Sequence, residues 1–344
     1  ASFGRNPAEV AISFDKFDVK QKIPVMKQTM LTLAILLNAC LLSSCSIGIG
    51  SNASRGQYAE KYAESGATAE VIERSLSVQP FTAIECNLPV AVTYVQTNDQ
   101  TSKVVLKGTP KMIERCIVEV NNGTLKLRLA RNPKRFLNSF SKSQDYLKLT
   151  VYGGQLTALA VQSACTFYAE RLEMPQLALS NSGASTIRVG RFVGQRLTMS
   201  CSGASSTKLA GNVAQLMLNV TGASSFVANE FATEDLKAKV SGASTAKCAL
   251  QGSAGVDVSG ASTLTLSGTS DSFTIKCSGA SNVKAAGLRA QNVLVDVSGA
   301  SGVKCYAERS IKGIVSNGSL TYGGHPTSFN VERQNTSASI KAVD

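Results

Sequence analysis

The sequence predicts an all-β fold, a right-handed, single-stranded parallel β-helix, from three observations. A four-residue motif, Ser-Gly-Ala-Ser or Thr-Gly-Ala-Ser, occurs seven times between residues 182 and 301, at intervals of 18 to 20 residues. Apolar and polar side chains alternate on both sides of each motif. The chain is also rich in Gly, with 28 residues, and has no Trp, a composition that disfavours an all-helical protein and suits a core of small aliphatic side chains.

Each repeat indicates two half-buried strands joined by a corner. When the first motif residue is position 0, apolar residues prevail at positions −5, −3, −1, +5 and +7, and this period of two is typical of strands with one buried face. Gly at +1 permits a tight bend, and Ala and Ser at +2 and +3 stack without crowding. Strands of successive coils then pair in parallel about 4.8 Å apart, because such repeats bury their apolar edges only by stacking. Right-handed winding follows from the chirality of parallel crossovers.

The repeat region is expected to span residues 161–326, with degenerate corners at Ser163–Cys165 and Ser316–Ser319. Residues 79–160 are expected to form N-terminal strands, a cap and the first coils, with a hairpin turn at Asn121-Asn122-Gly123. Residues 327–344 are expected to be a polar C-terminal tail. A β-propeller is disfavoured because its repeats are about twice as long, and a leucine-rich repeat because its asparagine signature is absent.

The segment before the repeats has the pattern of an export signal. Met26 and Lys27 provide a charged start, residues 31–42 form an apolar run too short to span a bilayer, and Leu42-Ser43-Ser44-Cys45 closely resembles the lipobox of bacterial lipoproteins. That resemblance implies cleavage after residue 44, lipidation of Cys45 and attachment of the remainder to a membrane. We therefore predict residues 1–25 as a misassigned start, 26–44 as a lipoprotein signal peptide and 45–78 as a polar tether. A plain secretory signal with an incidental Cys is the alternative.

Residues that usually carry catalysis are sparse. His325 is the only histidine and lies in a Gly-Gly-His-Pro turn, so neither a Ser-His-Asp triad nor a metal site is indicated, and no Gly-rich nucleotide-binding motif is present. We expect no catalytic residue, no metal, no cofactor and no nucleic-acid partner. The cysteines that share a column of the solenoid stand three or more coils apart, too far for a disulfide, and are expected to be small buried hydrophobes. Cys86 and Cys116 remain a candidate pair.

Two outward rows form the candidate binding stripe. Position +6 is the basic row, which consists of Arg188, Lys208, Lys247, Lys284 and Lys304. Position +4 is the hydroxyl row, which includes Thr186, Ser206, Ser225, Thr245 and Thr263. A charged stripe beside hydroxyls suits a linear anionic polysaccharide, which it would bind by repeated weak contacts. The alternative is a solvated face that keeps the strands soluble and deters association between sheets.

Three features together resemble a known family. The opening Phe81-Thr82-Ala83-Ile84, the Ser-Gly-Ala-Ser corners and the closing segment from Tyr322 to Pro326 are similar to the head GIN domain of auto-transporter adhesins, common among lipoproteins of Bacteroidetes. The similarity covers roughly residues 80–330. In that family the corner usually ends in Gly followed by Asp; here Ser stands in fourth place and Thr, Ser or Asn follows, which removes a possible acidic row. The resemblance implies a right-handed β-helix and an adhesin-like role, without catalytic residues to transfer.

These observations favour a non-catalytic protein of the cell envelope, lipid-anchored to the outer membrane on its periplasmic face or at the cell surface. It would act as an adhesin or scaffold toward an anionic polysaccharide or a host or extracellular surface, and a homo-oligomer is left open. The net charge of +12 favours anionic partners. Two alternatives remain, a carbohydrate-active β-helix enzyme of the polysaccharide lyase or hydrolase type and a purely structural envelope protein.

Overall fold

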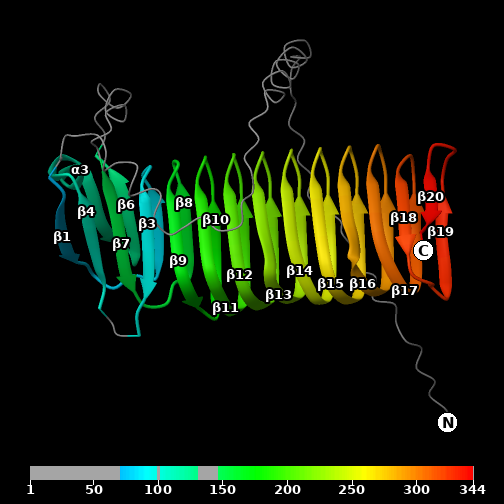
Figure 1. Cartoon of the computed structure of the whole chain (residues 1–344), viewed down its shortest axis with the longest axis horizontal. Helices are drawn as coiled ribbons and strands as arrows, with labels where there is room; N and C mark the ends of the chain where they lie inside the picture. Colours follow the sequence, from blue (N-terminus) through cyan, green and yellow to red (C-terminus); the bar gives the residue numbers. More distant parts are fainter. Residues whose placement is uncertain (1–69, 99–100, 131–145, 344) are drawn as a thin grey trace, which may run out of the picture. The chain divides into compact units, whose positions relative to one another are not determined.

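The computed structural model describes residues 70–98, 101–130 and 146–343. The predicted start, signal peptide, lipidation site at Cys45 and residues 45–69 of the predicted tether lie outside these residues. The end of the predicted tether is not a tether, because Ile72–Ser77 form a strand of the sheet. The described residues belong to one compact unit. Its described part is a parallel β-solenoid of about nine turns with roughly 20 residues per coil, which confirms the predicted fold class (Figure 1).

In the repeat region each coil is one long bent strand. The seven strands are β11 (Thr186–Cys201), β12 (Ser206–Val220), β13 (Ser225–Val240), β14 (Thr245–Val258), β15 (Thr263–Cys277), β16 (Asn282–Val297) and β17 (Gly302–Val315). They pair in parallel in sequence order, and a register shift midway along most ladders marks a bend (Figure 1). The bend separates a first face, positions +4 to +8, from a second face, positions −6 to −1. We call the segment between them the short side, for example residues 230–234 in β13.

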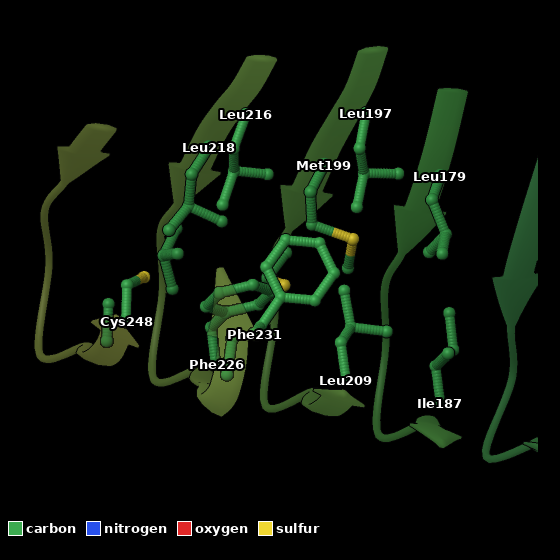
Figure 2. Close-up of a cluster of buried hydrophobic side chains, with 14 of the residues drawn as sticks. Leu179, Ile187, Leu197, Met199, Leu209, Leu216, Leu218, Phe226, Phe231 and Cys248 are labelled. Carbon is green, nitrogen blue, oxygen red and sulfur yellow. The ribbon is translucent and has the colours of Figure 1, made fainter. Parts of the chain in front are cut away.

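The core confirms the inward positions that the sequence alternation predicts. Every residue at −5, −3, −1, +5 and +7 in all seven repeats is buried. Figure 2 shows how the two faces share this core, with Leu197 and Leu216 of the second face opposite Ile187 and Leu209 of the first. Full burial of one such aliphatic side chain contributes roughly 1.5–3 kcal/mol, so stacked coils stabilise one another mainly through these columns.

The corners show why Gly is required at +1. In all seven motifs this Gly has a φ between +69° and +79°, a conformation that other residues rarely adopt. A Cβ on Gly222 would also stand 2.5 Å from the carbonyl oxygen of Gly203 in the preceding coil. The next residue, Ala223, donates its backbone N–H to that same oxygen at 2.7 Å. The corners therefore stack as closely as the strands, and a side chain at +1 would separate them.

At the N-terminal end the spatial order of the strands departs from the sequence order. The elements there are β1 (Ile72–Ser77), β2 (Ala83–Asn87), β3 (Ala91–Gln96), β4 (Lys103–Gly108), α3 (Pro110–Arg115), β5 (Cys116–Asn121), β6 (Thr124–Leu129), β7 (Leu147–Gly153), β8 (Ala158–Gln162), β9 (Thr166–Glu173) and β10 (Gln176–Asn181). β2 pairs in parallel with both β6 and β8, and β3 with both β7 and β9. The coil of β2 and β3 is therefore interleaved between two coils that come later in the chain.

Antiparallel strands close this end of the solenoid. β4 pairs with β7 and β1 with β4, while β5 and β6 form a hairpin. Its turn contains Asn122 with a φ of +49° and Gly123 with a φ of +71°, which confirms the predicted hairpin at Asn121–Gly123. The short helix α3 buries Met112 and Ile113. These elements cover the first coil, where an open strand edge would invite pairing with another chain.

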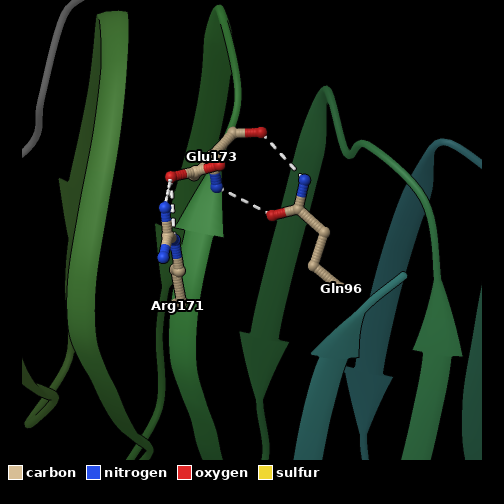
Figure 3. Close-up of polar contacts among 3 residues, drawn as sticks. All are labelled: Gln96, Arg171 and Glu173. Atoms are coloured by element: carbon tan, nitrogen blue, oxygen red, sulfur yellow. Dashed lines mark hydrogen bonds and ion pairs between the residues drawn. The ribbon is translucent and has the colours of Figure 1, made fainter. Parts of the chain in front are cut away.

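A side chain continues the ladder where β3 ends. Gln96 donates from its Nε2 to the carbonyl oxygen of Glu173 at 2.9 Å, and its Oε1 accepts the backbone N–H of Glu173 at 2.7 Å (Figure 3). Arg171 donates through its Nε to the Glu173 carboxylate at 2.8 Å. The Gln96 amide thus takes the place of a backbone partner beside the end of β9.

Both degenerate corners differ from the prediction in register. Val161 pairs with Asn181 at position −1, so Gln162 occupies position 0 and Cys165 position +3, one place later than the expected start at Ser163 implies. Ser163 and Ala164 both have a φ of +60° in this corner. At the other end Ser319 pairs with Gly302 at +4, which makes that corner one residue shorter than the others.

The solenoid continues past its predicted end at residue 326. Its last strands are β18 (Ser319–Gly323), β19 (Ser328–Arg333) and β20 (Ser339–Ala342). β19 pairs in parallel with β17, and β20 with β18. The prediction of a polar tail over residues 327–344 was therefore wrong as far as residue 342. The signal was missed because the last corner, residues 334–338, lacks the Ser-Gly-Ala-Ser motif.

Candidate functional site

The basic row lies on the first face with each member in register with its neighbours. Arg188 pairs with Lys208, and Lys284 pairs with Lys304. Between Lys208 and Lys284 the same column contains Val227, Lys247 and Thr265, each paired with the next. All five basic side chains are exposed. Because adjacent rungs are about 4.8 Å apart, successive cations stand roughly 5 or 10 Å from one another along the solenoid axis.

The hydroxyl row runs parallel to the basic row. Thr186 pairs with Ser206, Ser206 with Ser225, and the column continues through Thr245 and Thr263 in unbroken register. These side chains are exposed or half-buried. The row therefore offers one hydroxyl beside each rung of the basic row in these five coils, and each hydroxyl both donates and accepts hydrogen bonds.

The structure extends the basic row at both ends. Tyr168 pairs with Arg188 and is 42% exposed, so an aromatic ring continues the +6 column toward the N-terminus. Lys304 pairs with Thr321 and Thr321 with Lys341, which adds an exposed cation in the last coil. Sequence reasoning missed Lys341 because the column was counted only from the Ser-Gly-Ala-Ser motifs.

Charge is segregated between the faces. From Thr186 to Val343, positions +4, +6 and +8 of the first face contain no acidic residue. The acidic residues of the coils from β10 onward lie on the second face or the short side: Glu230, Glu234, Asp235, Asp257, Asp271, Asp296, Glu308 and Glu332. Asp257 and Asp296 stand two coils apart on the second face, with Lys276 between them and Lys239 beside Asp257. Signs therefore alternate in this column of the second face, whereas the charged residues at positions +4, +6 and +8 of the first face from Thr186 onward are all cationic.

Two surface grooves lie away from the first face. The larger, about 440 Å³, is bordered by residues 155–157, 175–178, Arg196 and Thr198. The smaller, about 330 Å³, lies on the short side, where Gln291 donates to the Glu308 carboxylate, and Arg289 stands 4.0 Å from that carboxylate and 5.0 Å from the Tyr306 ring centre. Neither groove contains a residue of the basic or hydroxyl row.

The thiols of the described residues are free. Burial raises the pKa of the Cys248 and Cys305 thiols to about 12, which suppresses the reactive thiolate and agrees with their expected role as small core residues. Cys116 lies on β5 in register with Leu129, whereas Cys86 on β2 is in register with Leu127 and Val161. The candidate pair of Cys86 and Cys116 is therefore not brought together in neighbouring positions.

His325 is exposed in the turn between β18 and β19. Within residues 70–98, 101–130 and 146–343, no group of three His, Cys, Asp or Glu side chains is placed to hold a metal ion. In the same ranges no helix is long and apolar enough to cross a membrane.

Comparisons with known proteins identify a family. The family model described as "Putative auto-transporter adhesin, head GIN domain" matches residues 80–264 and 251–326. A comparison with curated protein sequences gives no significant match.

Among solved structures, a "putative adhesin" from Bacteroides fragilis is 18% identical, with 80% of this chain and 97% of that chain covered and a TM-score of 0.38. A "Putative lipid binding protein" from Parabacteroides distasonis is 16% identical, with 80% and 98% covered and a TM-score of 0.44. A "putative adhesin" from Parabacteroides merdae is 14% identical, with the same coverage and TM-score. Since the family model spans well over half of its residues, the chain belongs to the family of the auto-transporter adhesin head GIN domain.

Proposed function

We propose that the chain is a non-catalytic adhesin or scaffold of the cell envelope that binds a linear anionic glycan along its first face. Membership of an adhesin family supports a role at the envelope or cell surface. The observation that carries the glycan-binding part of the proposal is the exposed basic row, which runs in register over a face without acidic residues.

The spacing of the row suits a polymer rather than a small ligand. The cations recur every one or two rungs, so they can contact the anionic groups that recur along an extended polymer. Each contact is weak because it is exposed to solvent. Many such contacts in a line add up to useful affinity by multivalency. The hydroxyl row supplies neutral hydrogen-bonding groups beside the cations, as a ligand that carries both anionic groups and sugar hydroxyls requires.

A charge-matched pair of variants tests this proposal. Replacing Lys208, Lys247, Lys284 and Lys304 by Gln removes four charges from the first face, and replacing Lys237, Lys239, Lys276 and Lys312 by Gln removes four from the second. We expect the first variant to lose retention on immobilised polygalacturonate at least tenfold, and the second to keep most of it. Dextran serves as the uncharged polymer.

Three outcomes of this experiment count against the proposal. Equal loss in both variants would indicate a response to net charge alone, and unchanged binding in the first variant would exclude the basic row. Size-exclusion chromatography of the same incubations measures the length of the polymer. A shortened polymer would favour the enzymatic alternative over a non-catalytic role.

We further propose that Cys45 carries a lipid that anchors the protein to the outer membrane. The support is the Leu-Ser-Ser-Cys sequence after a short apolar run. On expression in a Gram-negative host, metabolic labelling with an alkyne fatty acid should mark the wild type but not the Cys45→Ser variant, which should leave the membrane fraction. Labelling of Cys45→Ser to the wild-type level would refute the anchor. Cys40, which follows Leu37-Asn38-Ala39, is a second and weaker candidate, and label that is lost in Cys40→Ser but kept in Cys45→Ser would place the lipid on Cys40 instead.

A further inference from the structure

Two buried cysteines at the N-terminal end of the solenoid belong to neighbouring coils. Cys86 in β2 pairs in register with Val161 in β8, and Cys165 follows in the corner between β8 and β9. Both side chains are fully buried, with 0% of either exposed. The two residues are thus distant in sequence but adjacent in the stack, because the coil of β2 and β3 is interleaved beneath the coil of β8 and β9.

The repeat itself shows how such positions meet. Cys86 stands at position −1 of its coil, and Cys165 at position +3 of the next coil. In other coils the Ser at +3 reaches the residue at −1 of the preceding coil: Ser281 donates to the Val258 carbonyl oxygen and Ser301 to the Cys277 carbonyl oxygen, each at 3.0 Å. Burial raises the pKa of the Cys277 thiol and the hydroxyls of Ser281 and Ser301 oppose that rise; Ser301 stands at +3 of the next coil, the position that Cys165 holds relative to Cys86.

The register brings the two side chains to adjoining positions of neighbouring coils. A hydrogen bond with Cys165 is the main reason that the pKa of the Cys86 thiol is raised well above its ordinary value, and burial adds to the effect. Within the described residues, this is the place where a thiol at −1 faces a thiol at +3 of the next coil. Elsewhere the +3 partner is Ser.

We propose that Cys86 and Cys165 form a disulfide that joins the interleaved coil to the coil above it. The cross-link would close a loop of about 80 residues that contains the strands from β3 to β8, including β4, β5, β6 and β7 of the antiparallel end of the solenoid. A long loop is where a cross-link removes most entropy from the unfolded chain, so this disulfide would hold the end of the solenoid in place.

The chemistry needs an external disulfide as oxidant, such as oxidised glutathione. One cysteine thiolate attacks the donor disulfide and releases one thiol, and the second cysteine thiolate then attacks the mixed disulfide and releases the other. The two cysteines lose two protons and two electrons, and the donor is reduced to two thiols. Because both side chains are buried once the coils stack, the exchange takes place during folding.

Peptide mapping tests the proposal independently of ligand binding and of export. The protein is unfolded, refolded with oxidised and reduced glutathione, alkylated in denaturant without reductant, and digested with trypsin. Cys86, Cys116 and Cys165 fall in separate tryptic peptides, residues 75–103, 116–126 and 149–171. We expect peptides 75–103 and 149–171 to be recovered cross-linked, and residues 116–126 to be alkylated. Complete alkylation of all three, or a cross-link between 75–103 and 116–126, would overturn the proposal.

The repeat supplies conservative variants. Cys165→Ser restores the residue found at +3 in seven coils, and Cys86→Val introduces the residue found at −1 in four of them. Both should fold, and neither should give the cross-linked peptide. The oxidised wild type should melt at least about 5 °C above the reduced protein, whereas the melting temperature of either variant should not respond to reductant. An equal response of the variants would place the sensitive cysteines elsewhere.

Discussion

At the scale of single residues, the departures from the repeat are compensated in pairs. Asn181 at −1 and Thr207 at +5 are polar in columns that are otherwise apolar, and both are buried. Asn181 donates from its Nδ2 to the Thr207 hydroxyl and to the Ser206 carbonyl oxygen, both at 2.8 Å, and its Oδ1 accepts the Ser185 hydroxyl at 2.6 Å. The buried side chains of Asn181 and Thr207 therefore both have a partner in their own or a neighbouring coil.

This pairing predicts a non-additive mutational effect. Asn181→Val introduces the residue common at −1 but leaves the Thr207 hydroxyl with only the weak Cys201 sulfur contact, at 3.5 Å. We expect it to lower the free energy of unfolding by about 1–3 kcal/mol, the cost of an unsatisfied buried polar group. Adding Thr207→Val should recover part of that loss, and denaturant titration of both single variants and the double variant measures the coupling. Purely additive losses would show that the two side chains do not depend on each other.

At the scale of the coil, the sequence was sufficient wherever the repeat is regular. Positions relative to the corner predicted the buried columns and the in-register basic row, because in a solenoid one coil repeats the environment of the next. The prediction failed where the corner loses its motif. Gln162 replaces Ser at position 0, and the corner at residues 334–338 reads Gln-Asn-Thr-Ser-Ala in place of Ser-Gly-Ala-Ser, so the register at Cys165 and the coil containing Lys341 were missed.

The interleaving of β2 and β3 was beyond sequence reasoning for a different reason. Alternation shows that a strand has one buried face, but β2, β6 and β8 all alternate, and any of their stacking orders buries the same side chains. The observed order is distinguished by backbone pairing between strands that are distant in the chain. The corner at residues 87–90 takes part in this pairing, because Thr166 donates its N–H to the Val90 carbonyl oxygen at 3.0 Å. Such long-range pairing leaves no local pattern.

At the scale of the whole solenoid, the basic row on the first face has a defined length. The basic row runs from Arg188 to Lys341 over nine rungs, which are eight steps and a span of about 38 Å at strand spacing. On the second face, Lys239, Asp257, Lys276 and Asp296 alternate in sign, and opposite charges on neighbouring rungs offset one another. A polyanion is therefore attracted along one line of the solenoid, and the length of that line limits how many contacts a single polymer chain can make.

That limit predicts how affinity depends on the length of the ligand. For oligogalacturonates of increasing length, the affinity should rise with each added anionic unit until the oligomer spans about 38 Å, and longer oligomers should gain little more. The salt dependence should steepen over the same range, because more counterions are released as more cations are engaged. Fluorescence anisotropy with labelled oligomers measures both trends, and Lys341→Gln should shorten the length at which affinity levels off, because it removes the last cation of the row. An affinity that is already maximal for a disaccharide or trisaccharide would instead indicate a compact site such as the groove beside Arg289, since such a site is filled by a few sugar units and gains nothing from a longer chain.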